Sequence, residues 1–110
     1  MLRIIVFGGH GRIAILLAPL LVARGDEVTG VIRNPDHSSD VEAGGAKALV
    51  TDVESMDVEA LAEIIRGHDA VVWSAGAGGG SAERTYAVDR HAAQRSMDAA
   101  ERAGVRRYVM

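Results

Sequence analysis

Short apolar runs alternate along the chain with longer segments of helical periodicity. Residues 4–7 and 70–73 are unbroken apolar runs, as in strands that are covered on both faces. Residues 27–32 and 47–51 predict two further strands, and a fifth begins at residue 105. These runs together predict five short strands.

Helical periodicity fills the intervals between these strands. We predict helices over residues 12–24, 56–66 and 83–103, and a short polar helix or loop over residues 36–43. Gly25 and Gly67 stand where two of these helices should stop, and Ser55 is the expected N-cap of the second long helix. The apolar side chains of the first helix predict a buried stripe, which consists of Ile13, Leu16, Leu17, Leu20 and Leu21.

Strands that alternate with helices through short loops favour parallel pairing and right-handed crossovers. The predicted fold class is therefore α/β, a Rossmann-like doubly wound parallel sheet of five strands in the order 3-2-1-4-5. The 110 residues suffice for one domain, which spans residues 1–110.

Composition narrows the function classes. A net charge of −3 argues against a basic nucleic-acid-binding face, and the four histidines show no metal-ligand spacing, so we expect neither nucleic acid nor metal as a partner. The most apolar run, residues 13–23, is shorter than the ~20 residues of a membrane span. A strand and a glycine turn come before any cleavage-like site, so we expect a soluble, cytoplasmic protein without a membrane partner.

The first strand leads into a glycine-rich turn with the spacing G-x-x-G-x-x-A, a form of the dinucleotide fingerprint. Gly8 permits a sharp turn and Gly11 a close approach of the backbone to a ligand. The helix that follows offers unpaired N–H groups to a pyrophosphate. Within this turn the candidate cofactor-binding residues are Gly8, His10, Gly11, Arg12 and Ile13. For Arg12, a phosphate contact and an ordinary surface position both stay open, and His10 could simply face solvent.

A second group of candidates follows the second strand. Ligands bind outside the carboxyl ends of the strands in such a sheet, where the strand order reverses. Arg33 stands 22 residues after Gly11, where a carboxylate would hold the ribose of NAD. A guanidinium pairs bidentately with phosphate, which favours NADP, with NAD as the alternative. A solvated arginine at a strand end is the other interpretation.

The remaining candidates follow the third and fourth strands. Asp52 could accept a hydrogen bond from the adenine amino group, with Val53 packed on the ring, or it could begin a turn. Ser74, Ala75 and Gly76 would lie beneath the nicotinamide ribose, or form an ordinary loop. We therefore expect a nicotinamide dinucleotide as the principal ligand.

These stretches together resemble a known family, the atypical and extended short-chain dehydrogenase/reductases. The closest likeness is to their NAD(P)H-binding subgroup, which is NmrA-like and flavin-reductase-like, and it is carried by residues 8–14, 31–35, 51–53, 69–76, 88–89 and 103–110. The resemblance implies an NAD(P)-dependent oxidoreductase. It leaves two alternatives, a sugar-nucleotide epimerase or dehydratase and a non-catalytic NAD(P)-sensing regulator.

The resemblance assigns no catalytic residue within these 110 residues. The family pattern continues with a Tyr-x-x-x-Lys pair after the fifth strand, whereas Tyr86 and Arg90 have that spacing in the helix before it. Asp89 lies where the family often has asparagine. The chain thus resembles the cofactor half of a longer pattern, truncated after strand five, so its small-molecule substrate is unknown. Apolar surface exposed there would favour a homodimer.

Overall fold

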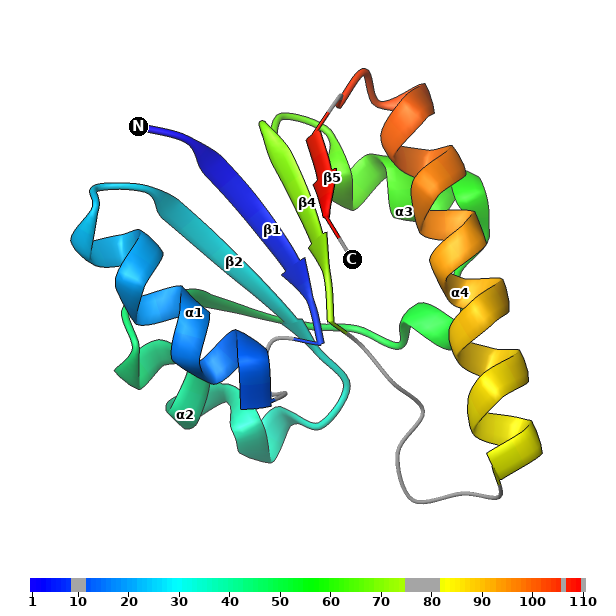
Figure 1. The fold of residues 1–110 in the computed structure, drawn as a ribbon, viewed down its shortest axis with the longest axis horizontal. Helices are drawn as coiled ribbons and strands as arrows, with labels where there is room; N and C mark the ends of the chain where they lie inside the picture. Colours follow the sequence, from blue (N-terminus) through cyan, green and yellow to red (C-terminus); the bar gives the residue numbers. More distant parts are fainter. Residues whose placement is uncertain (9–11, 75–81, 106, 110) are drawn as a thin grey trace.

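The structure, a computed structural model, describes residues 1–8, 12–74, 82–105 and 107–109. Its centre is a five-stranded parallel sheet in the order β3-β2-β1-β4-β5 (Figure 1). The strands are β1 (Arg3–Phe7), β2 (Glu27–Ile32), β3 (Lys47–Val50), β4 (Ala70–Trp73) and β5 (Arg107–Val109). The predicted fold class and strand order are confirmed.

Four helices lie against this sheet within the described residues, two on each face (Figure 1). On one face are α1 (Arg12–Ala23) and α2 (Ser38–Ala43), and on the other are α3 (Val58–Ile65) and α4 (Ala82–Arg102). The polar segment that follows β2 forms a 3-10 turn (Pro35–His37) before α2. This two-sided cover agrees with right-handed crossovers between parallel strands.

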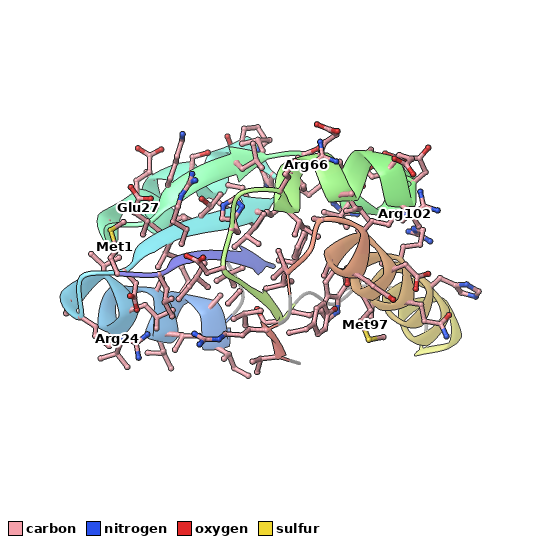
Figure 2. All side chains as sticks on the ribbon, turned by 90° about the horizontal axis from the view of Figure 1, so that it is seen from above. Met1, Arg24, Glu27, Arg66, Met97 and Arg102 are labelled. Carbon is pink, nitrogen blue, oxygen red and sulfur yellow. The ribbon has the colours of Figure 1, made fainter. Side chains whose placement is uncertain are left out.

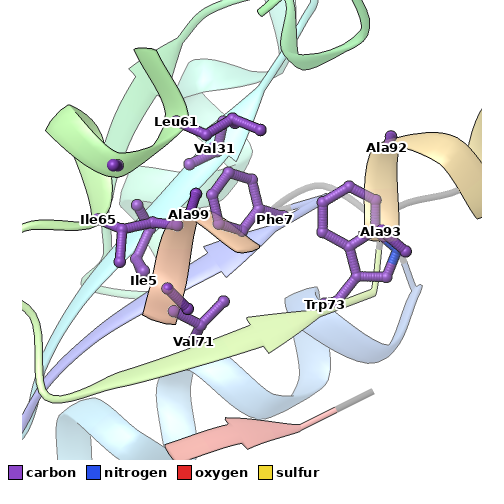
Figure 3. Close-up of a cluster of buried hydrophobic side chains, with 12 residues drawn as sticks. Ile5, Phe7, Val31, Leu61, Ile65, Val71, Trp73, Ala92, Ala93 and Ala99 are labelled. Atoms are coloured by element: carbon purple, nitrogen blue, oxygen red, sulfur yellow. The ribbon is translucent and has the colours of Figure 1, made fainter. Parts of the chain in front are cut away.

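The larger part of the core lies between the sheet and the α3–α4 layer (Figure 3). Alternate side chains of β1 and β4 face these helices, including Ile5, Phe7, Val71 and Trp73. From the helices come Leu61 and Ile65 of α3 and small residues of α4, namely Ala92, Ala93, Ala99 and Ala100. Small α4 side chains allow the helix to approach the sheet closely.

The predicted stripe of the first helix is wrong at three of its five positions, while Leu17 and Leu21 are half-buried. Ala14 and Ala18 are the buried residues of α1, at 1% and 9% exposure, whereas Ile13, Leu16 and Leu20 are 68%, 67% and 69% exposed. Apolar residues surround this helix on all sides, so periodicity alone could not tell which side meets the sheet. The side of α1 that packs on the sheet is the one with Ala14 and Ala18, whose side chains are single methyl groups.

The predicted N-cap of the third helix is also wrong. Asp57 caps α3 because its carboxylate accepts a hydrogen bond from the N–H of Ala60 at 2.8 Å. The Ser55 hydroxyl donates instead to the main-chain oxygen of Asp52 at 3.0 Å, which closes a short 3-10 turn before the helix. The helix therefore begins two residues later than expected.

Asp26 holds the amino-terminal edge of the sheet together. Its carboxylate accepts a hydrogen bond from the N–H of Leu2 at 2.9 Å and one from Arg24 Nε at 2.8 Å. The Leu2 N–H and then the Arg24 guanidinium outweigh the effect of burial and lower the pKa of Asp26 below its usual 3.8. This edge lies opposite the glycine turn.

Candidate cofactor-binding site

The register of the sheet brings the ends of the central strands to one edge. Phe7, the last residue of β1, lies opposite Val31 on one side and Trp73 on the other. Ile32 at the end of β2 lies opposite Val50 at the end of β3. The residues that follow these strands are the predicted candidates Gly8, Arg33, Asp52 and Ser74, so parallel pairing gathers them at the carboxyl edge.

Gly8 makes the turn that leaves β1. Its φ is +80°, in the region that favours glycine, and its N–H donates to the main-chain oxygen of Val31 at 3.1 Å. The sheet pairing therefore continues one residue beyond the strand before the chain turns. This geometry fits the role that the sequence predicted for Gly8, a sharp turn in front of a helix.

Ser74 fastens the end of β4 to this turn. Its N–H donates to the Phe7 oxygen at 3.0 Å, and its hydroxyl donates to the same oxygen at 3.1 Å and to the Gly8 oxygen at 3.4 Å. The single hydroxyl proton is thus directed at the main chain of β1. The side chain keeps only acceptor capacity toward a ligand in this arrangement.

Arg33 is exposed directly after β2. Asn34 fixes the backbone beside it, because its side-chain oxygen accepts a hydrogen bond from the N–H of Asp36 at 2.9 Å and starts the turn that Pro35 continues. The arginine is therefore presented from a structured strand end at the same edge as Gly8. The sequence did not single out this capping role of Asn34.

Asp52 and Val53 follow β3 at the same edge. The N–H of Thr51 donates to the Ile32 oxygen at 2.8 Å, which anchors the segment to β2. Asp52 is exposed, while the half-buried Val53 packs against the core under α3 and α4. At least part of the Val53 side chain thus packs in the core, which limits the surface that it can present to an adenine ring.

Several predicted residues lie outside the described part of the chain: His10, Gly11, Ala75 and Gly76, together with the side chain of Arg12. Arg12 and Ile13 are the first two residues of α1, whose leading N–H groups lack helical partners. The Ile13 side chain is exposed at the start of this helix.

An aromatic pair beneath the site was not anticipated. The rings of Phe7 and Trp73, at the ends of adjacent strands, have centroids 5.4 Å apart and are tilted by 35° (Figure 3). Both side chains are buried, and each immediately precedes a residue of the site. The signal was present in the sequence as two aromatic residues that end two predicted strands.

This edge geometry agrees with a comparison of the chain against protein families. The model of the NAD(P)H-binding family matches residues 8–110. The chain belongs to the NAD(P)H-binding family. The matched span starts at the Gly8 turn and includes every predicted site residue. The family resemblance drawn from the sequence is confirmed at the level of a short-chain dehydrogenase/reductase-like, NAD(P)-binding fragment.

Two curated relatives cover nearly the whole chain. The UPF0659 protein C216.03 of Schizosaccharomyces pombe is 36% identical over 96% of this chain and 44% of its own length. The uncharacterized sugar epimerase YhfK of Bacillus subtilis is 29% identical over 99% of this chain and 51% of its own length. The chain thus spans about half the length of the curated relatives it matches.

A solved structure has a similar fold over nearly the whole of this chain. It is a short-chain dehydrogenase/reductase superfamily protein from Agrobacterium tumefaciens with bound NAD, and the likeness has a TM-score of 0.75 at 29% identity. The match covers 96% of this chain and 31% of that protein. Together with the family, this neighbour supports a nicotinamide dinucleotide as the ligand class.

The described residues contain no helix that is long and apolar enough to cross a membrane. They also contain no group of three or more histidine, cysteine, aspartate or glutamate residues placed to hold a metal ion.

Proposed function

We propose that this chain is the NADP-preferring cofactor-binding domain of a short-chain dehydrogenase/reductase-like oxidoreductase. The observation that carries the proposal is the gathering of Gly8, Arg33, Asp52 and Ser74 at one edge of the sheet by strand register and main-chain hydrogen bonds. Membership of the NAD(P)H-binding family supports a dinucleotide as the ligand. The exposed Arg33 supports a preference for the dinucleotide that carries a 2′-phosphate.

Each part of the site has a distinct task in this proposal. The turn at Gly8 and the first N–H groups of α1 would receive the pyrophosphate, since a helix start favours anions. Arg33 would pair with the 2′-phosphate, and Asp52 would accept a hydrogen bond from the adenine amino group. The bound cofactor would supply hydride transfer. The described residues supply binding and orientation, and the groups that move protons to substrate are not assigned to them.

The test is a calorimetric titration of wild-type chain and Arg33→Ala with NADPH and NADH. A charge-assisted hydrogen bond contributes about 1.5–3 kcal/mol, so Arg33→Ala should weaken NADPH binding by roughly ten- to a hundredfold and leave NADH binding nearly unchanged. Trp73 is the one tryptophan of the chain and ends the strand beside the site, so quenching of its fluorescence gives an independent binding signal.

Arg66→Ala is the matched control. Arg66 is also exposed, but it follows α3 and pairs with Glu63 at 2.8 Å on the outside of the helix layer. This variant loses the same charge and should bind both cofactors as wild type does. An equal loss of NADPH and NADH affinity in Arg33→Ala would reject the 2′-phosphate assignment, and absence of binding of either cofactor to wild type would reject the proposed function.

The likeness to the sugar epimerase YhfK of Bacillus subtilis favours a second candidate, the cofactor domain of a sugar-nucleotide epimerase or dehydratase. An epimerase returns its cofactor to the starting oxidation state after each turnover. A protein as long as the relatives would then convert a sugar nucleotide without net consumption of NADPH, whereas an oxidoreductase would consume it in proportion to product. A non-catalytic sensor would bind the cofactor and do neither.

A further inference from the structure

The segment between β3 and α3 carries the two residues that the proposed function assigns to adenine, Asp52 and Val53. Its 3-10 turn (Val53–Ser55) is closed locally, because the Ser55 N–H and the Ser55 hydroxyl both donate to the main-chain oxygen of Asp52, at 3.3 Å and 3.0 Å. Bonds between residues three apart shape a turn but do not fix where the turn lies relative to the sheet. That position depends on contacts with other elements.

Hydrogen bonds to distant parts of the chain hold both ends of this segment. At its start, the N–H of Thr51 donates to the Ile32 oxygen of β2 at 2.8 Å. At its end, Arg95 Nε of α4 donates to the main-chain oxygen of Met56 at 3.1 Å, across 39 residues of sequence. The Thr51 hydroxyl also donates to the Met56 sulfur at 3.5 Å, which joins the two ends. Segment 51–56 is thus held between β2 and α4.

The packing of α4 directs Arg95 toward this segment. Ala92 and Ala99, three residues before Arg95 and four after it, are buried in the core, so position 95 lies at the border of the buried face. Arg102, about two helical turns further on, pairs with Glu59 near the start of α3. Figure 2 shows Arg102 on the side of α4 that faces α3. One flank of α4 therefore faces both the start of α3 and the turn before it (Figure 1).

The two arginines on this flank differ in burial. Arg95 is half-buried, whereas the Arg102 side chain is 58% exposed. A hydrogen bond from a charged donor that is partly sheltered from water contributes more than an exposed ion pair does. Displacement of Met56 would displace the turn, because the Met56 N–H donates to the Val53 oxygen at 3.2 Å. The bond from Arg95 therefore constrains the residues that precede Met56.

We propose that Arg95 is the positioning residue for the adenine half of the dinucleotide, an inference that rests on the proposed function and deepens it. Arg95 acts through the Met56 carbonyl and not on the cofactor. Through the turn it holds Asp52 and Val53 at the carboxyl edge of β3, where the adenine ring would meet them. Its effect falls on the part that NADPH and NADH share, in contrast to Arg33, whose proposed partner is the 2′-phosphate.

Two substitutions at position 95 separate the hydrogen bond from the charge. Glutamine carries its amide nitrogen as many bonds from the backbone as arginine carries Nε, so Arg95→Gln keeps an N–H for the Met56 oxygen and loses the charge. Methionine has a methyl group at that place, so Arg95→Met keeps the length and loses the donor. Both residues favour helix as arginine does. Arg102→Met is the matched control, because Arg102 belongs to the same helix but pairs with Glu59.

Calorimetric titration of the chain with NADPH, NADH and ADP, which all carry adenine, tests the inference. Arg95→Met should weaken the binding of all three by a similar factor of about three- to tenfold, as expected for the loss of one net hydrogen bond. Arg95→Gln should restore most of this affinity, and Arg102→Met should bind as wild type does. In an Asp52→Ala background, Arg95→Met should weaken binding by a smaller factor, because the two residues act on the same half of the site.

Hydrogen exchange of wild type follows the segment without a substitution and keeps the inference testable if Arg95→Met does not fold. Saturation with NADPH should slow the exchange of the Ser55 and Met56 N–H groups, which close the turn. Four results would overturn the inference and leave the proposed function standing: unchanged affinity in Arg95→Met, an equal loss in Arg95→Gln, an undiminished factor in the Asp52→Ala background, or binding without slower exchange at these groups. A wild type that binds no dinucleotide would reject both.

Discussion

Ser74→Ala isolates the hydrogen bonds that fasten β4 to the glycine turn. The substitution removes the donor to the Phe7 oxygen at 3.1 Å and to the Gly8 oxygen at 3.4 Å. The Phe7 oxygen keeps the Ser74 N–H at 3.0 Å, so no buried carbonyl of β1 is left wholly without a donor. A net hydrogen bond contributes about 0.5–1.5 kcal/mol, and we expect a loss of unfolding free energy of about 1 kcal/mol.

Urea unfolding followed by the fluorescence of Trp73 measures this loss. With a slope of about 1–3 kcal/mol per molar urea, the midpoint of Ser74→Ala should fall by roughly 0.5 M at unchanged slope. The matched control is Ser55→Ala, which removes an exposed hydroxyl that also donates to a main-chain oxygen, that of Asp52 at 3.0 Å. Water replaces the exposed bond, so its midpoint should move less.

Two outcomes would contradict this role of the Ser74 hydroxyl: Ser74→Ala unfolds at the same urea concentration as wild type, or the two alanine variants lose equal stability. Either outcome would mean that the Ser74 hydroxyl is not engaged with β1 as the distances indicate. Cofactor binding is a separate readout. If the Gly8 turn holds the pyrophosphate, Ser74→Ala should weaken NADPH and NADH equally, in contrast to the selective loss expected for Arg33→Ala.

Three further predictions concern the core, one pKa and one helix cap. Phe7→Ala should cost about 3–5 kcal/mol in thermal or urea unfolding, because a fully buried ring is lost, and it should change the emission of Trp73. Asp26→Asn should reduce stability at neutral pH. Since folding lowers the Asp26 pKa below 3.8, its contribution is complete above that value and disappears as the pH falls through the folded-state pKa, so the two stability curves should converge in acid. Asp57→Ala should cost about 1 kcal/mol by loss of the α3 cap, whereas Asp57→Ser should retain most of the stability; a circular dichroism melt distinguishes them.

Much of the candidate site could be predicted from the sequence because strand ends are locally encoded. Apolar runs that stop at Gly8, Arg33 and Ser74 place those residues at one edge once the strands are parallel. The contacts that the side chains make could not be predicted from the strand ends. Ser74 directs its proton to β1, and Val53 packs partly in the core, because the segments that they touch are distant in sequence.

The sequence by itself determined the order and type of the elements, since period, glycine stops and short loops are properties of neighbouring residues. It also determined the family, through a glycine turn and strand-end residues in a fixed order. Only the tertiary structure decided which face of α1 is buried. Ala14 and Ala18 and the larger Leu16 and Leu20 are all apolar, so hydrophobicity could not rank them. Close helix–sheet packing selects the small side chains and leaves Leu16 and Leu20 exposed.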